Sequence, residues 1–95
     1  MEVVISKSTK PDKRLKATFE NKTVHFGAKS GSTYVDHRDK KTKENWEARH
    51  MVRENWQDYD SAGALSKHIL WNKPTIAASI RDLNARQKQY TFALK

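Results

Sequence analysis

The chain has 95 residues, with 19 Lys and Arg against 11 Asp and Glu, so its formal net charge at pH 7 is +8. It contains no cysteine, which excludes disulfides, thiolate zinc sites and cysteine nucleophiles. A hydrophobic fraction of 36% allows only a small core, and the length predicts a single domain over residues 1–95. The positive charge favours a polyanionic partner, either nucleic acid or an acidic protein surface, over charge that serves solubility alone.

The sequence shows no sign of export or of membrane insertion. Met1–Ile5 is too short and too acidic at its start for a signal peptide. No apolar run approaches the roughly 20 residues that a membrane span needs. The absence of cysteine fits a reducing compartment or the interior of a virus particle. We therefore expect a protein without a membrane span, located inside a cell or a virion.

Residues 1–36 are expected to be mainly β structure. Glu2–Ser6 contains three consecutive β-branched residues and indicates a short strand. Apolar and polar residues then alternate in 15–20 and again in 23–27, which is the period of a half-buried strand. Because only Asn21-Lys22 separates these runs, they predict a β-hairpin closed by a tight turn or by a longer loop.

The segments that follow the hairpin give weaker signals. Gly27–Ser32 is rich in Gly and Ser and predicts a flexible loop. Thr33–Val35 carries β-branched and aromatic residues and predicts a third short strand. Asp36–Lys43 is dense in charge, so we expect it to be a solvated segment.

Residues 43–88 are expected to be mainly α-helical. The spacing of apolar residues predicts three helices, at 43–56, 62–71 and 74–88. The second is apolar on nearly all sides and should be the central buried element. A final alternating segment, 89–95, predicts a short strand that returns against the hairpin. The expected fold class is therefore α+β, with a small N-terminal antiparallel β-hairpin or sheet packed on about three α-helices.

A capping residue and a helix-terminating segment predict where two of these helices begin and end. Asp60 or Ser61 is suited to cap the second helix. The apolar run that ends at Trp71 is followed at once by Asn72-Lys73-Pro74. Asn tolerates the left-handed conformation that ends helices, and the residue before a proline is pushed out of the helical region. Pro74 suits the first turn of the next helix, so we expect a sharp corner with Trp71 at the joint.

The first predicted helix has two different sides. At about 100° per residue, the side expected to face the core carries Ala48, Met51, Val52 and Trp56. The opposite side carries Trp46, Arg49, His50 and Arg53. Arginine suits phosphate oxygens and tryptophan suits base stacking, so this second side predicts a nucleic-acid or phosphate contact. The alternative is that Trp46 packs onto the hairpin while the two arginines lie around it.

Catalytic and metal-binding patterns are missing from the sequence. None of the four histidines lies at a recognised ligand spacing from another histidine or a carboxylate. Gly27–Thr33 has a faint likeness to a phosphate loop, but it lacks the Gly-Lys-Ser/Thr ending and a following helix. Ser66 and His68 are two residues apart on a predicted helix and do not face each other. We expect no metal, no cofactor and no enzymatic activity, and a His68 that is packed or hydrogen-bonded at the edge of the core.

The remaining candidate binding groups are mainly positively charged side chains. Besides the basic helix side, lysines lie in the loop after the hairpin, in the charged segment and in the corner before Pro74. The residues expected to contact nucleic acid or another polyanion are Lys29, Lys40, Lys41, Trp46, Arg49, His50, Arg53 and Lys73.

Several short motifs occur in a recognisable order between residues 15 and 86. They are Phe-Gly-Ala-Lys, Ala-Arg-His, an acidic turn with Ala-Gly and Leu-Trp-Asn-Lys-Pro, at Phe26–Lys29, Ala48–His50, Asp60–Gly63 and Leu70–Pro74. In this order the chain resembles a family of small, basic, uncharacterised proteins encoded by large double-stranded DNA viruses. It departs from the family pattern at the hairpin turn, which lacks the usual Gly, and at Ala64-Leu65, where larger aromatics are common.

The resemblance implies a viral source and no particular activity. Together with the charge, it leads to the hypothesis of a non-catalytic protein that binds nucleic acid, in the first place double-stranded DNA, and is associated with the genome or the virion. The alternatives are a minor capsid or cement protein that contacts acidic viral structural proteins, and a binder of a host factor. The sequence does not predict the oligomeric state.

Overall fold

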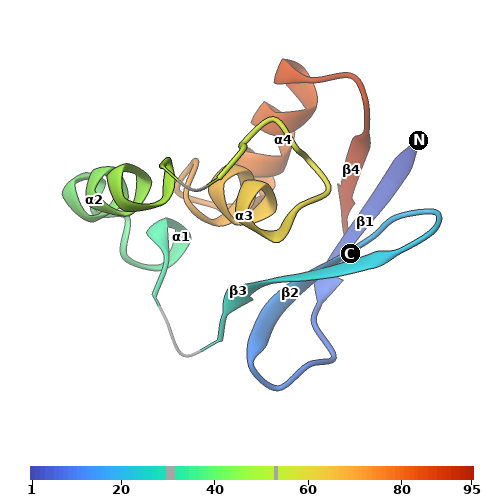
Figure 1. Ribbon diagram of the computed structural model, residues 1–95, viewed down its shortest axis with the longest axis horizontal. Helices are drawn as coiled ribbons and strands as arrows, with labels where there is room; N and C mark the ends of the chain where they lie inside the picture. Colours follow the sequence, from blue (N-terminus) through green and yellow to red (C-terminus); the bar gives the residue numbers. More distant parts are fainter. Residues whose placement is uncertain (30–31, 53) are drawn as a thin grey trace.

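The computed structural model describes residues 1–29, 32–52 and 54–95 (Figure 1). It has the predicted α+β fold, with a four-stranded sheet made of β1 (Glu2–Lys7), β2 (Lys13–Thr18), β3 (Thr23–Ala28) and β4 (Thr91–Leu94). The helical elements are α1 (Tyr34–His37), α2 (Lys40–His50), α3 (Ala62–Leu65), the π-helical turn η1 (Ser66–Leu70) and α4 (Ile76–Arg86). No helix in these described ranges has the length and apolar character to cross a membrane.

The sheet has the strand order β3-β2-β1-β4. The predicted hairpin is confirmed, because β2 and β3 are antiparallel neighbours and the N–H of Phe19 donates to the carbonyl of Lys22 at 2.8 Å. The predicted C-terminal strand is also present as β4. It was expected against the hairpin, but it pairs with β1 at the far edge of the sheet. The helices carry the chain over the sheet, so the chain re-enters it parallel to β1 (Figure 1).

The core lies between one face of the sheet and the helices α3, η1 and α4. Strand alternation directs Val3 and Ile5 of β1, and Leu15 and Ala17 of β2, toward this core. The helical side is formed chiefly by the predicted central element, which the chain builds as α3 followed directly by η1 and which buries Ala64, Leu65, His68, Ile69 and Leu70. Ser61 caps α3 by accepting from the N–H of Ala64, as one of the two predicted caps.

The region between the sheet and α2 differs from the prediction. Thr33–Val35 was expected to be a strand, but it leads into α1. The carboxylate of Asp36 accepts from the backbone N–H of Thr33 at 2.8 Å, which closes the first turn of that helix. The charged segment Asp36–Lys43 is mostly exposed, as expected, but α2 begins within it. Asp39 caps this helix by accepting from the N–H of Lys41 at 3.0 Å. This local capping outweighs the β propensity of the short run.

The corner after η1 is sharp, but Asn72 and Pro74 do not have the roles predicted for them. Asn72 has no left-handed backbone, because Arg38 is the only non-glycine residue with positive φ in the described part of the chain. Asn72 is buried instead, and its amide donates to the carboxylate of Asp82 on α4 at 2.8 Å. Pro74 lies outside α4, which is capped by Thr75 through the N–H of Ala78. Trp71 is buried at the joint, as predicted.

Gly27 is a position where only glycine fits. It has φ +81 within β3, and a Cβ there would lie 2.6 Å from Cδ1 of Leu70. We expect Gly27→Ala to lower the free energy of unfolding by about 2–4 kcal/mol, because a left-handed alanine and overpacking both cost stability. Urea titration measures the change.

Gly63→Ala is the matched control for this substitution. The three atoms nearest to a Cβ at Gly63 all belong to the carboxylate end of Glu54, which is a flexible side chain. Its stability should therefore stay within about 1 kcal/mol of the wild type, helped by the higher helix propensity of alanine. Equal stability losses for the two variants would contradict the packing account.

Candidate functional site

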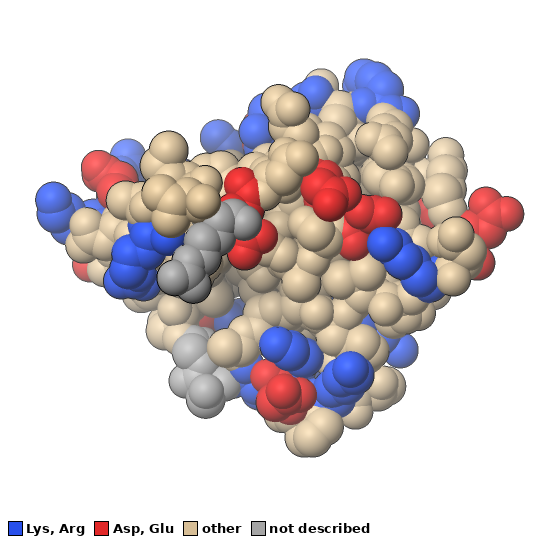
Figure 2. Space-filling view, viewed as in Figure 1, with Lys and Arg blue, Asp and Glu red and all other residues tan. Residues whose placement is uncertain are grey.

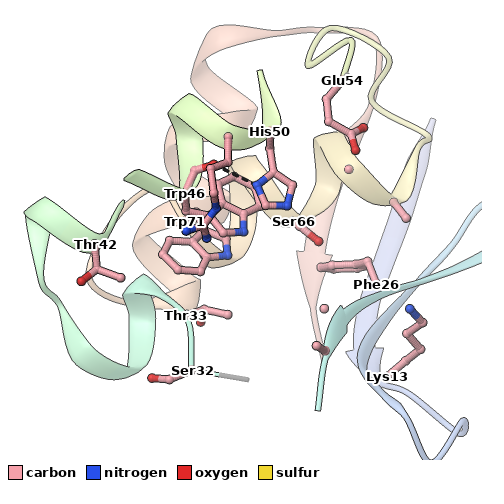
Figure 3. Close-up of a pocket in the computed structure, with 15 residues that line it drawn as sticks. Lys13, Phe26, Ser32, Thr33, Thr42, Trp46, His50, Glu54, Ser66 and Trp71 are labelled. Carbon is pink, nitrogen blue, oxygen red and sulfur yellow. Dashed lines mark hydrogen bonds between the residues drawn. The ribbon is translucent and has the colours of Figure 1, made fainter. Parts of the chain in front are cut away.

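A pocket of about 540 Å³ opens between α2, the start of α3, the start of β2 and the end of β3. We call it the α2 pocket (Figure 3). Its described lining combines aromatic rings, cationic side chains, hydroxyl groups and a single carboxylate, that of Glu54. Its volume is in the range of about 300–1,000 Å³ that is typical of sites for small organic ligands.

The aromatic wall is a stack of rings centred on Trp46. Its indole lies 4.8 Å from the ring of Trp71 with an interplanar angle of 9°, and 4.2 Å from the imidazole of His50 with an angle of 19°. The indole of Trp56 is also parallel to it, at 6.4 Å. Trp46 is half-buried and packs against the core. Trp46 is therefore packed, as the alternative expected, but its ring lies on Trp71 at the corner and not on the hairpin.

The side of α2 that was predicted to face the core is the exposed one. Ala48 is exposed, and Met51 and Val52 are 60% and 78% exposed. The prediction failed because α2 ends at His50, so Met51, Val52 and Trp56 do not continue its helical face. The helix instead turns Trp46 inward, since that ring buries far more apolar surface than alanine does.

His50 is held in a defined orientation. Its Nδ1–H donates to the carbonyl of Trp46 at 2.9 Å, because a carbonyl can only accept. The bond keeps the imidazole stacked on the Trp46 indole. Nε2 has no hydrogen-bond partner among the described residues, so the ring offers the pocket a polar edge.

Two longer cations complete the charged wall, Lys13 from β2 and Arg49 from α2. Neither takes part in an ion pair within the described residues. Lys13 was not among the predicted site residues, but strand alternation could have indicated it. It lies two residues before Leu15 and therefore on the core-facing side of β2.

The structure brings only some of the predicted residues together. Trp46, Arg49 and His50 line the α2 pocket. Lys29 is exposed and follows Ala28 of the lining directly. Its backbone N–H donates to the carbonyl of Asp12, at the turn before β2. Three predicted lysines are exposed but do not line the pocket. They are Lys40 and Lys41 at the start of α2 and Lys73 in the corner. Arg53, and Ser30-Gly31 of the predicted loop, lie outside the described residues.

Glu54 is placed by the absence of a side chain at Gly63. A Cβ at Gly63 would lie 1.9 Å from Oε2 of Glu54, so the carboxylate rests directly on the glycine. Figure 3 shows Glu54 at the top of the close-up and Lys13 at the bottom right. The two opposite charges therefore sit at separate places on the wall. Sequence reasoning gave no signal for Glu54, because its position depends on a contact across the loop to α3.

An ion pair between Arg14 and Asp36 fixes Thr33, one of the hydroxyl residues of the pocket wall. Arg14 of β2 holds both carboxylate oxygens of Asp36, with Nη2 at 2.7 Å from Oδ1. Asp36 also accepts from the hydroxyl of Thr33, a buried residue of the pocket wall. The Arg14 bond, together with those from Thr33, lowers the pKa of the Asp36 carboxyl well below its usual range.

His68 anchors the loop that carries Trp56. The guanidinium of Arg86 donates to Nδ1 of His68 at 3.1 Å, so the other nitrogen carries the proton and Nε2–H donates to the carbonyl of Trp56 at 2.7 Å. His68 is buried, which confirms its predicted packed role. Burial, followed by the nearby charges of Arg86 and Lys67, lowers its pKa.

Comparison with known proteins identifies a family. Residues 3–50 match the model of a family of unknown function, DUF5754, so the match covers just over half of the chain. The chain belongs to this family. The matched range contains Lys13, Arg49 and His50 of the pocket, while Glu54 and α3 lie beyond it. No curated protein and no solved structure matches the chain.

His68 predicts a pH dependence of stability. Its pKa is lowered in the folded state, so the unfolded chain takes up the proton first, near its ordinary pKa of about 6.5. The contribution of His68 to the free energy of unfolding is therefore complete above that pH and declines as the pH falls below it. Urea titrations at pH 7.5 and 5.5 should show this loss in the wild type.

His68→Gln is the matched variant, because it keeps a donor and an acceptor but cannot titrate. The other histidines are the same in both proteins and cancel in the comparison. His68→Gln should lose less stability than the wild type between the two pH values. Equal losses would show that His68 is not held neutral.

Proposed function

We propose that this member of DUF5754 is a non-catalytic protein that binds nucleic acid through the α2 pocket and the cations beside it. The observation that carries the proposal is that Lys13, Arg49 and His50 line one pocket with aromatic rings. Cationic groups serve the phosphates and aromatic rings serve the bases, and proteins that bind single strands combine these two elements.

Further cations support this proposal at the adjacent end of the sheet. The end of β1, the start of β2 and the end of β3 meet there, as the pairings of Lys7 with Leu15 and of Lys13 with Ala28 show. Exposed lysines surround this end, at Lys7, Lys10 and Lys29. Figure 2 shows blue groups around one red group at the bottom of the molecule, where Figure 1 places the loop between β1 and β2. A backbone of phosphates could run from the pocket onto these lysines.

Among the described residues, four of the eleven acidic side chains form ion pairs, those of Asp36, Glu47, Asp60 and Asp82. Their partners are Arg14, Lys67, Lys22 and Arg86, none of which lines the α2 pocket. The cations of the pocket and of the sheet end are therefore among those that remain for a polyanion. The viral origin and the association with a genome or virion stay predictions.

Contact with a protein partner is a second candidate function. It is favoured by Met51 and Val52, two adjacent apolar side chains that are 60% and 78% exposed. This is the kind of surface that a minor structural protein or a host-factor binder would use. Ordered copies in a virus shell, remote from the genome, would favour this candidate.

Removal of the two pocket cations tests the proposed function. Lys13→Ala with Arg49→Ala should weaken binding to a fluorescein-labelled DNA 12-mer, measured by anisotropy as single strand and as duplex. The slope of log affinity against log salt should become shallower by roughly 1–2, because each lost phosphate contact removes about 0.7–0.9. The fold should persist, since neither side chain has an ion-pair partner in the described ranges.

The control is Arg81→Ala with Lys88→Ala, which removes the same charge from exposed positions on and just after α4. This variant should keep most of the affinity of the wild type. Absence of any binding by the wild type at about 50 mM salt would refute the proposed function, because the release of counterions is strong there. Equal losses in the two double variants would refute the pocket as its location.

A further inference from the structure

We infer that the α2 pocket receives one unpaired base of a single strand and prefers a base with an exocyclic amino group. The inference rests on the proposed function and names the form of nucleic acid that the same site takes. It departs from the double-stranded DNA that was expected from the sequence.

The size of the pocket restricts what can enter it. Its volume of about 540 Å³ suits a ligand of the size of one nucleotide. A paired base lies inside the duplex, stacked between its neighbours, and cannot reach the floor of a pocket without leaving the stack. An unpaired base needs no such unstacking, so the pocket favours single strands.

The aromatic wall gives the base a place to stack. Trp46 already has the rings of Trp71, His50 and Trp56 against it, so much of its own surface is covered. His50 stacks on Trp46 and has no other ring partner among the described residues. A base placed on the face of the imidazole opposite Trp46 would extend the existing stack by one ring. Histidine is one of the side chains on which unstacked bases are bound.

The charges on the wall orient such a nucleotide. Lys13 suits the phosphate, and Glu54 lies at a separate place on the wall (Figure 3). Glu54 has no ion-pair partner in the described part of the chain. A carboxylate only accepts hydrogen bonds, and the exocyclic amino group of cytosine donates to such acceptors. Thymine has no amino group, and its only donor on the pairing edge, N3–H, lies between two carbonyl oxygens that repel a carboxylate. It should therefore bind less tightly.

Substitution of Gly63 by alanine displaces the Glu54 carboxylate without changing the charge of the protein. A Cβ at this position would overlap the carboxylate, so Gly63→Ala should move the acceptor away from its place. Glu54→Gln keeps the shape of the side chain but removes its charge. The two variants test the same acceptor in independent ways, and the second serves if the first disturbs the fold.

The experiment compares labelled oligo(dC) and oligo(dT) 12-mers with a mixed-sequence duplex 12-mer, by anisotropy at low salt. The wild type should bind oligo(dC) about tenfold more tightly than oligo(dT), which is the effect of one hydrogen bond to a charged group. It should bind both more tightly than the duplex. In Gly63→Ala and Glu54→Gln the preference for oligo(dC) should fall to about twofold or less, with the affinity for oligo(dT) equal or higher.

The outcomes separate this inference from the proposed function. Equal affinity for oligo(dC) and oligo(dT), or tighter binding of the duplex, would overturn the inference while the salt dependence of the pocket cations could still hold. A preference for oligo(dC) that survives both variants would overturn the role of Glu54. Binding of none of the three probes would count against the proposed function itself.

Discussion

The stack of Trp46 on Trp71 is the contact on which the position of α2 depends. No residue of α2 is fully buried, and most of its surface is polar and solvated. Two further contacts tie α2 to the rest of the fold, the ion pair between Glu47 and Lys67 at 2.8 Å and the ammonium of Lys43 over the ring of Tyr34 at 5.1 Å. Such pairs near the surface contribute little to stability, so the rings supply most of the attachment. Because α2 forms one wall of the α2 pocket, the pocket exists only while this stack holds.

The same stack decides what the pocket can offer to a ligand. Trp46 serves the structure, so the side chains left for binding are those around it, chiefly His50, Arg49 and Lys13. His50 belongs to both roles, since one face lies on Trp46 and its Nδ1 bond fixes the ring. The buried His68 supports this arrangement because its Nε2–H donates to the carbonyl of Trp56 and so fixes the loop that carries that ring. Structure and proposed binding therefore share a single aromatic cluster.

The parts of the fold that were predictable are those set by local pattern. The hairpin follows from alternation around Asn21-Lys22, and the central helical element follows from its apolar residues. The errors have long-range causes. The α1 helix depends on Asp36, which Arg14 holds from a strand 22 residues earlier in the chain. The inward side of α2 depends on Trp71, whose place no local spacing indicates. Lys13 was recoverable from alternation, whereas Glu54 was not.

A double-mutant cycle between Trp46 and Trp71 tests the central claim most directly. Trp46→Leu, Trp71→Leu and the double variant keep apolar side chains at both positions, and urea titration gives their free energies of unfolding. We expect a coupling of about 0.5–1.5 kcal/mol between the two rings, the range found for stacked aromatic pairs. Additive effects, within about 0.3 kcal/mol, would show that the rings do not hold α2 and would contradict the account.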